Sequence, residues 1–164
     1  MNEKEQERLK QLAEKEEPTT KALFKKLKRA RKARKLDDLV HELHNEAFEE
    51  INCLDCANCC KSISPIIHEK DIQRISRHLK IKPSEFTQTY LKLDKEGDFV
   101  FQQTPCPFLL PDNYCSIYPI RPKSCKEYPH TDRKNIQQIL LLTLKNSFIC
   151  PAVFKITKRM KDIL

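Results

Sequence analysis

The sequence predicts a mostly helical domain with one small antiparallel β hairpin. Apolar residues recur three and four positions apart through most of the chain, which is the spacing of one face of an α-helix. Short apolar runs bounded by turn residues are concentrated between residues 98 and 118. The third observation is a set of eight cysteines, four of them within residues 53–60. The chemistry of the domain therefore depends on its cysteines.

The first fifty residues are predicted to form a charged helical arm. Good helix formers such as Glu, Lys, Gln, Leu and Ala dominate this stretch. Pro18 is expected to break the helix, and Thr19 or Thr20 can cap a second one. The second helix carries an apolar stripe that should pack against another element, formed by Leu36, Leu39, Val40, Leu43 and Ala47. The chain is thus divided into an arm of residues 1–50 and a cysteine-cluster domain of residues 51–164.

A run of basic residues without an acidic one interrupts the arm. Its members are Lys25, Lys26, Lys28, Arg29, Arg31, Lys32, Arg34 and Lys35. Such a run is typical of a solvated helix face; the alternative interpretation is a contact surface for an acidic protein partner, RNA or DNA. No aromatic residues are interleaved with the charges, so a stacking platform for single-stranded nucleic acid is not indicated.

The segment from residue 62 to residue 103 is predicted to contain extended chain, two helices and a strand. Residues 62–67 are extended, a helix covers 70–79, and a second helix begins at Pro83. The strand covers 98–103 and follows a turn at Gly97, the only glycine. The residues expected to line the two helices are Ile72, Ile75 and Leu79 in the first, and Phe86, Tyr90 and Leu91 in the second.

The rest of the chain is predicted to contain the hairpin and three more helices. The hairpin pairs residues 108–110 with 114–118 across a Pro-Asp-Asn turn at 111–113. A short helix opened by Pro122 covers 121–128, and a last helix begins at Pro151. The stretch 135–144 contains six Ile and Leu residues and is expected to be a buried helix.

The cysteines are the part of the sequence that points to a chemistry. Thiolates are soft ligands that bind zinc, copper(I) and iron–sulfur clusters. Residues 53–60 follow the pattern C-x2-C-x2-C-C, and a two-residue gap lets neighbouring cysteines close on one ion. We therefore expect a metal-stapled domain whose metal ligands are Cys53, Cys56, Cys59, Cys60, Cys106, Cys115, Cys125 and Cys150.

Eight thiols divide into two sites of four ligands each. Adjacent side chains point in different directions, so Cys59 and Cys60 are expected to serve different sites. One of this pair would join Cys53, Cys56 and one distant cysteine, and the other would join the remaining three. The spacing matches the start of a bacterial ferredoxin motif but not its end, and the second C-x2-C knuckle of a zinc ribbon is missing. Zinc, mononuclear iron, a 4Fe-4S cluster and a thiol–disulfide role all stay open.

Composition and charge restrict the setting of this chemistry. No stretch is apolar for long enough to cross a bilayer, and the charged start lacks the apolar region of a secretory signal. We expect a cytoplasmic protein, and structural disulfides are rare in that compartment. The net charge is +8, with 13 basic and 12 acidic residues in 1–50 and 18 basic and 11 acidic residues in 51–164. Metal-bound thiolates would offset this excess locally, so the charge does not require nucleic acid.

Other residues give weaker signals. No phosphate-binding loop, dinucleotide fingerprint, Ser–His–Asp set or carboxylate pair is evident, so no catalytic or organic-cofactor residue is assigned. Arg121 would lie against sulfur or a bound anion, or would pair with a carboxylate. Asp55 is expected to cap the turn of the cysteine loop. His68 and His130 are alternative ligands, although eight thiols leave little need for them.

The cysteine segments resemble the YkgJ-type cysteine-cluster (CxxCxxCC) family, a bacterial family named for zinc or iron chelation. The similar motifs span about residues 51–154 and are Cys53-x2-Cys56-x2-Cys59-Cys60, Pro105-Cys106-Pro107-Phe108-Leu109, Tyr114-Cys115-Ser116-Ile117-Tyr118, Arg121-Pro122-x-x-Cys125 and Cys150-Pro151-Ala152. The resemblance implies that these cysteines chelate metal. The domain is also similar to a segment of flagellin lysine methylases, which implies a link to methyl transfer, but the chain has no glycine-rich cofactor loop.

The sequence thus predicts a protein that binds zinc, iron or an iron–sulfur cluster without a catalytic motif of its own. Two alternatives stay open. The first is a metal- or iron–sulfur-dependent protein-modifying enzyme, or its accessory subunit. The second is a zinc module that binds nucleic acid through the basic run.

Overall fold

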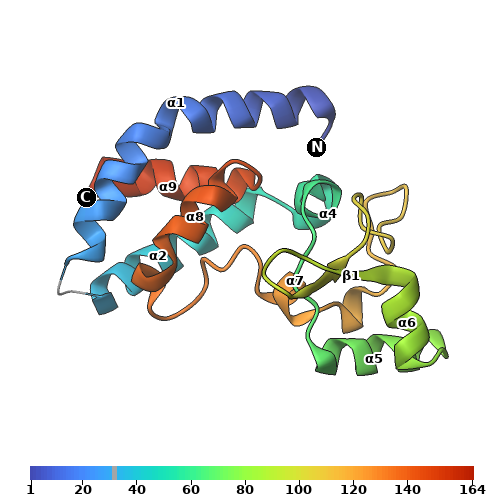
Figure 1. The fold of residues 1–164 in the computed structure, drawn as a ribbon. Coiled ribbons are helices and arrows are strands. Elements are labelled where there is room, and N and C mark those ends of the chain that lie inside the picture. The colour runs from blue at the N-terminus through green and yellow to red at the C-terminus, as the bar shows by residue number, and fades with distance from the viewer. Residues whose placement is uncertain (31–32) are drawn as a thin grey trace. The chain divides into compact units, whose positions relative to one another are not determined.

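The computed structural model describes residues 1–30 and 33–164. Its helices and strands form two compact units (Figure 1). The first unit consists of Met1–Cys56 and Pro129–Leu164, and the second of Ala57–Tyr128. Most of the ordered structure is helical, and one two-stranded antiparallel sheet is present, as the sequence predicts. The division into an arm of residues 1–50 and a domain of residues 51–164 stays a prediction.

The first unit is a bundle of helices from both ends of the chain. Its members are α1 (Glu3–Lys28), α2 (Ala33–Glu50), α3 (Cys53–Cys56), the 3-10 helix η2 (Ile136–Ile139), α8 (Leu140–Ser147) and α9 (Pro151–Ile163). Helices α1 and α2 both pack against α9, and α1 also packs against α8. The apolar stripe predicted for α2 supplies part of the core, because Val40, Leu43 and Ala47 are buried.

The prediction that Pro18 breaks the first helix is wrong. α1 begins at an Asn2 cap, whose side chain accepts from the Glu5 amide at 3.0 Å, and it continues past Pro18 to Lys28. A proline inside a helix removes one hydrogen bond and costs about 3 kcal/mol. Burial of apolar residues on both sides of it, including Leu9 and Phe24, opposes that cost. Packing therefore overrides the local signal.

The stretch 135–144 differs from its prediction in two ways. It begins as the 3-10 helix η2 and becomes α-helical only at Leu140. It is also not buried all round, since Leu141 keeps an exposed fraction of 65% while Leu140 and Leu144 are buried. The start of η2 is fixed from α2, where the Asp37 carboxylate accepts from the amides of residues 135 and 136 at 2.7 and 2.9 Å.

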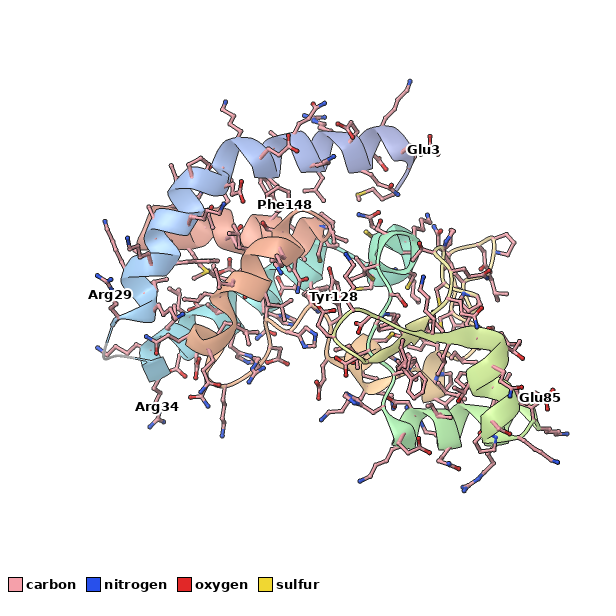
Figure 2. The ribbon with its side chains drawn as sticks, viewed as in Figure 1. Glu3, Arg29, Arg34, Glu85, Tyr128 and Phe148 are labelled. Carbon is pink, nitrogen blue, oxygen red and sulfur yellow. The ribbon has the colours of Figure 1, made fainter. Side chains whose placement is uncertain are left out.

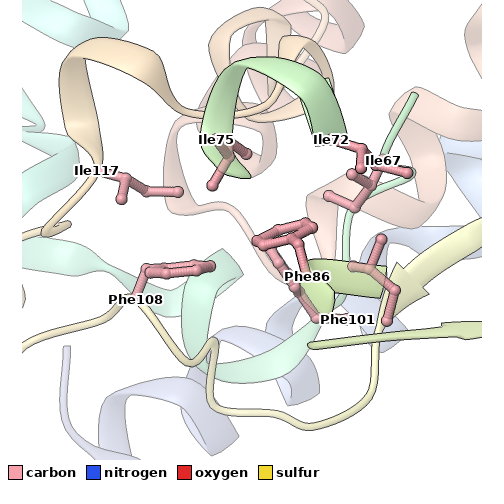
Figure 3. Close-up of a cluster of buried hydrophobic side chains, with 8 residues drawn as sticks. Ile67, Ile72, Ile75, Phe86, Phe101, Phe108 and Ile117 are labelled. Atoms are coloured by element: carbon pink, nitrogen blue, oxygen red, sulfur yellow. The ribbon is translucent and has the colours of Figure 1, made fainter. Parts of the chain in front are cut away.

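The second unit is built around eight buried apolar residues (Figure 3). Its elements are α4 (Asn58–Ser62), α5 (Glu69–Leu79), α6 (Pro83–Tyr90), β1 (Leu91–Leu93), β2 (Phe99–Phe101), the 3-10 helix η1 (Tyr118–Ile120) and α7 (Lys123–Glu127). The helix predicted over 70–79 is confirmed, with Ile72 and Ile75 facing this core. The core cluster comprises Ile67, Ile72, Ile75, Phe86, Leu91, Phe101, Phe108 and Ile117.

The hairpin is present but lies elsewhere in the sequence than predicted. β1 pairs with β2 in the register Leu91↔Phe101, and Gly97, at a φ of +86°, supplies the left-handed residue of the turn. The predicted hairpin over 108–118 is reduced to one isolated bridge, Leu109↔Cys115. The end of the predicted second strand is instead part of the 3-10 helix η1, which begins at Tyr118.

The described part of the basic run is solvent-exposed. Lys25, Lys26 and Arg29 lie at the end of α1, Arg34 lies at the start of α2, and Figure 2 shows the side chains of Arg29 and Arg34 extending away from the helices. Arg31 and Lys32 lie outside the described residues. None of the helices in the described ranges has the length and apolar character needed to span a membrane.

Candidate metal centre

Four of the eight cysteines are brought together within the second unit. The amide of Cys106 donates to the carbonyl of Cys60 at 2.8 Å, which joins α4 to the loop that follows β2. The isolated bridge Leu109↔Cys115 then folds the Cys115 segment back beside that loop. Cys125 lies in α7. These contacts collect thiols that are far apart in the sequence.

The electrostatics of these thiols show that they share one environment. Burial, together with negative charge at Cys60, Cys106 and Cys115, raises the pKa of Cys125 to about 12. Burial likewise raises the pKa of Cys106 to about 11, with added effects from Cys60 and Cys115. The pKa of Cys115 is raised by burial and by the charge of Cys60. The charge of one thiol changes the pKa of another because all four lie within electrostatic reach.

Cys60 differs from its three neighbours. A hydrogen bond with the adjacent Cys59, helped by the charge of Lys61, lowers the pKa of Cys60 to about 7 against the effect of burial. The two Sγ atoms are 4.0 Å apart. The expectation that these neighbouring side chains simply diverge is therefore wrong, because the tight turn of α4 keeps both sulfurs in contact. Cys60 can carry negative charge near neutral pH, where the other three are thiols.

The first unit contains a second, smaller group of cysteines. Cys53 and Cys56 lie at the ends of α3, and Cys150 is the residue before α9. Burial, together with negative charge at Cys53 and Cys56, raises the pKa of Cys150 to about 11. The Asn52 side chain caps the start of α3 by accepting from the Leu54 amide at 3.1 Å. From the sequence, a cap is predicted from Asp55 and not from Asn52, although an Asn one residue before a helix is itself a capping signal.

The donors fit zinc or iron, but they are not arranged around a single point. All eight cysteines are reduced, because none is part of a disulfide. Among residues 1–30 and 33–164, no group of three or more His, Cys, Asp or Glu side chains is placed so that it could hold a metal ion. Neutral thiols have no charge that would draw them toward a common centre, whereas metal binding requires thiolates. The structure therefore contains the donor set, in two groups, without coordination geometry.

A family model matches residues 52–145 of the chain. It is the CxxCxxCC model, described as a "putative zinc- or iron-chelating domain". The chain belongs to the CxxCxxCC family. Seven of the eight cysteines fall within the matched span, and Cys150 lies beyond it. No curated protein and no solved structure matched the chain.

One cation lies beside the larger cysteine group of this CxxCxxCC domain. The Arg121 guanidinium carbon is 3.9 Å from the centroid of the Tyr118 ring, and its Nη1 donates to the Tyr118 carbonyl at 2.9 Å. Its charge opposes the rise in the pKa of Cys115 and of Cys125. Of the two roles predicted for Arg121, these contacts support a place near sulfur.

His68 and His130 stay predicted alternative ligands, and the structure describes a backbone contact of His68. His68 is the residue before α5, and its amide donates to the Asp71 carboxylate at 3.2 Å. Sequence reasoning missed Asp71 and Arg74, which join α5 to the start of α7. An Asp and an Arg three positions apart normally form a solvated pair, so only burial of the carboxylate could have singled them out.

Proposed function

We propose that this CxxCxxCC protein binds zinc or iron through two sets of cysteine thiolates. The first set is Cys60, Cys106, Cys115 and Cys125, and the second includes Cys53, Cys56 and Cys150. Cys59 is proposed as a ligand from its place in the C-x2-C-x2-C-C motif, without assignment to either set. The observation that carries the proposal is that four thiols from separate segments of the second unit lie within electrostatic reach of one another, with backbone contacts that join the segments of Cys60, Cys106 and Cys115.

The first set is suited to hold a soft cation. Cys60 supplies a thiolate near neutral pH, and the entering cation provides the charge that lets the remaining thiols lose their protons. Four thiolates on a divalent ion leave a formal charge of about −2, which Arg121 would partly offset. A zinc ion held by four thiolates has no open position and acts as a staple, whereas iron or an iron–sulfur cluster would add electron transfer.

The proposal requires that the thiols stay reduced, so we place the protein in a reducing compartment such as the cytoplasm. A protein partner for the helices of residues 1–50, and nucleic acid bound by the exposed basic residues, are further proposals. Nucleic-acid binding should weaken steeply with salt if basic side chains contact phosphates. No affinity for RNA or DNA at low ionic strength would end that alternative.

Elemental analysis of the full chain isolated without oxygen tests the proposal directly. We expect zinc or iron at a fixed ratio to protein, with visible sulfur-to-iron absorption only if the metal is iron. Cys125→Ser should reduce the metal content, while Lys126→Ala, which changes an exposed neighbour on the same helix, should not. Wild-type protein that takes up neither metal under anaerobic conditions would overturn the proposal.

A further inference from the structure

The helix that carries Cys125 is too short to hold its own position. α7 has five residues, and an isolated helix of that length is not stable in water. The other three thiols of the set lie on segments that are linked more directly. The Cys106 amide donates to the Cys60 carbonyl, and Leu109 bridges to Cys115. The placement of Cys125 therefore depends on what holds α7.

A buried carboxylate on α5 holds the start of α7. Asp71 has an exposed fraction of 1%. Its Oδ1 accepts from the Lys123 amide at 3.1 Å and from Nη2 of Arg74 at 2.6 Å, while its Oδ2 accepts from the His68 amide at 3.2 Å. The amide of Lys123 is one of those that α7 cannot satisfy internally, so Asp71 caps α7 from another helix.

The partner of this carboxylate holds the chain that leads into α7. Nε of Arg74 donates to the Ile120 carbonyl at 3.2 Å, and its Nη2 donates to the Arg121 carbonyl at 3.0 Å. The hydroxyl of Ser124 adds a contact to the Ile66 carbonyl at 2.9 Å. One ion pair thus fixes backbone groups at residues 120, 121 and 123, and the last of these is two residues before Cys125.

We propose that the Asp71–Arg74 pair is a positioning device that keeps the Cys125 thiol within reach of Cys60, Cys106 and Cys115. This inference rests on the proposed function, because positioning matters only if these thiols share a metal. Neither residue is a metal ligand. Groups that orient ligands typically affect metal affinity by 10- to 100-fold when they are changed.

The test measures metal protection of individual cysteines in the full chain. Anaerobic protein is equilibrated with a series of zinc buffers and alkylated, and mass spectrometry reports which thiols zinc protects. Asp71→Asn and the milder Arg74→Gln should raise the free zinc needed to protect Cys106 and Cys115 by about 10- to 100-fold. Protection of Cys150, which belongs to the other unit, should not change.

Control variants separate positioning from loss of folding. Glu69→Gln neutralises an exposed carboxylate in the same first turn of α5 and should have no effect. In a Cys125→Ser background, Asp71→Asn should weaken protection of Cys106 little further, because the thiol that it positions is already absent. Circular dichroism should show that each variant keeps its helices, and Arg74→Gln replaces Asp71→Asn if the latter unfolds.

The outcomes distinguish the two claims. A similar loss caused by Asp71→Asn with and without Cys125 would mean that the pair only stabilises the unit, and this would overturn the positioning role. Normal zinc protection in both Asp71→Asn and Arg74→Gln would overturn it as well, while leaving the proposed function intact. Failure of zinc and iron to protect any cysteine of the wild type would overturn the proposed function itself.

Discussion

Metal uptake by the set Cys60, Cys106, Cys115 and Cys125 should depend steeply on pH. A thiol must lose its proton to bind metal, so the apparent affinity falls with each proton that competes. The raised pKa of Cys106, Cys115 and Cys125 keeps these three protonated at neutral pH, whereas the pKa of Cys60 is about 7. Binding should therefore release about 4 protons below pH 6, about 3.5 at pH 7 and about 3 at pH 8.

The change in affinity follows from the same values. Three protons compete fully between pH 7 and pH 6, which gives a factor of about 1,000. The ionised fraction of Cys60 falls about fivefold over that interval, because its pKa is about 7. The affinity of this set for zinc should consequently fall roughly 5,000-fold from pH 7 to pH 6.

The assay resolves this set from the other cysteines. At each pH between 6 and 8, the free zinc concentration that gives half-protection of Cys106 and Cys115 against alkylation is measured by mass spectrometry. The logarithm of that concentration should change with a slope of about 4 at the acidic end and about 3 at the alkaline end. A slope of one or less would refute the reasoning, because it would mean that most of these thiols are not ligands.

Three further predictions concern single residues. Phe86→Ala should lower the free energy of unfolding by about 3–5 kcal/mol, because the ring is fully buried. Leu93→Ala, at an exposed position, should change it by less than about 0.5 kcal/mol. Urea unfolding measures both values. Burial lowers the pKa of His44, so the folded state favours the neutral ring. That stabilisation is present above pH 6.5 and is lost as the pH falls, so the pH dependence of urea unfolding should be weaker in His44→Gln; identical profiles would contradict it. Arg121→Gln should weaken zinc protection of the nearby thiols about tenfold, whereas Arg121→Lys, which keeps the charge, should weaken it less; equal losses would argue against an electrostatic role.

Local patterns predicted the helices well and the strand pairing poorly. Residues 70–79 form a helix as predicted, because Ile72 and Ile75 repeat at helical spacing and face a core. Leu91 is predicted to lie on a helix face, but it begins β1. The turn at Gly97 brings Phe101 opposite Leu91, and the two residues pair. Strand pairing depends on a partner distant in the sequence, and short apolar runs do not identify that partner. Whether the helix continues through Pro18 also depends on packing partners distant in the sequence, which the local pattern does not identify.

The sequence predicted the donor atoms but could not determine their grouping. Both members of the pair Cys59–Cys60 fit either site by spacing alone. The structure places Cys60 in one environment with Cys106, Cys115 and Cys125, through a backbone contact between residues 60 and 106 that no pattern encodes. The buried role of Asp71 was equally invisible, because it depends on the course of the chain between η1 and α7.

Cys106, Cys115 and Cys125 lie in a segment where regular structure is sparse, and this would give a bound metal a physical role. The apolar core of this unit is built mainly from α5, α6 and the two strands, with Phe108 and Ile117 as contributions from the chain after β2. The regular structure within residues 102–128 consists of η1, α7 and one isolated bridge. Ordering each residue of such a segment costs about 1–2 kcal/mol of backbone entropy. Metal binding energy is also folding energy, so thiolates spaced along this segment would offset part of that cost once they share an ion.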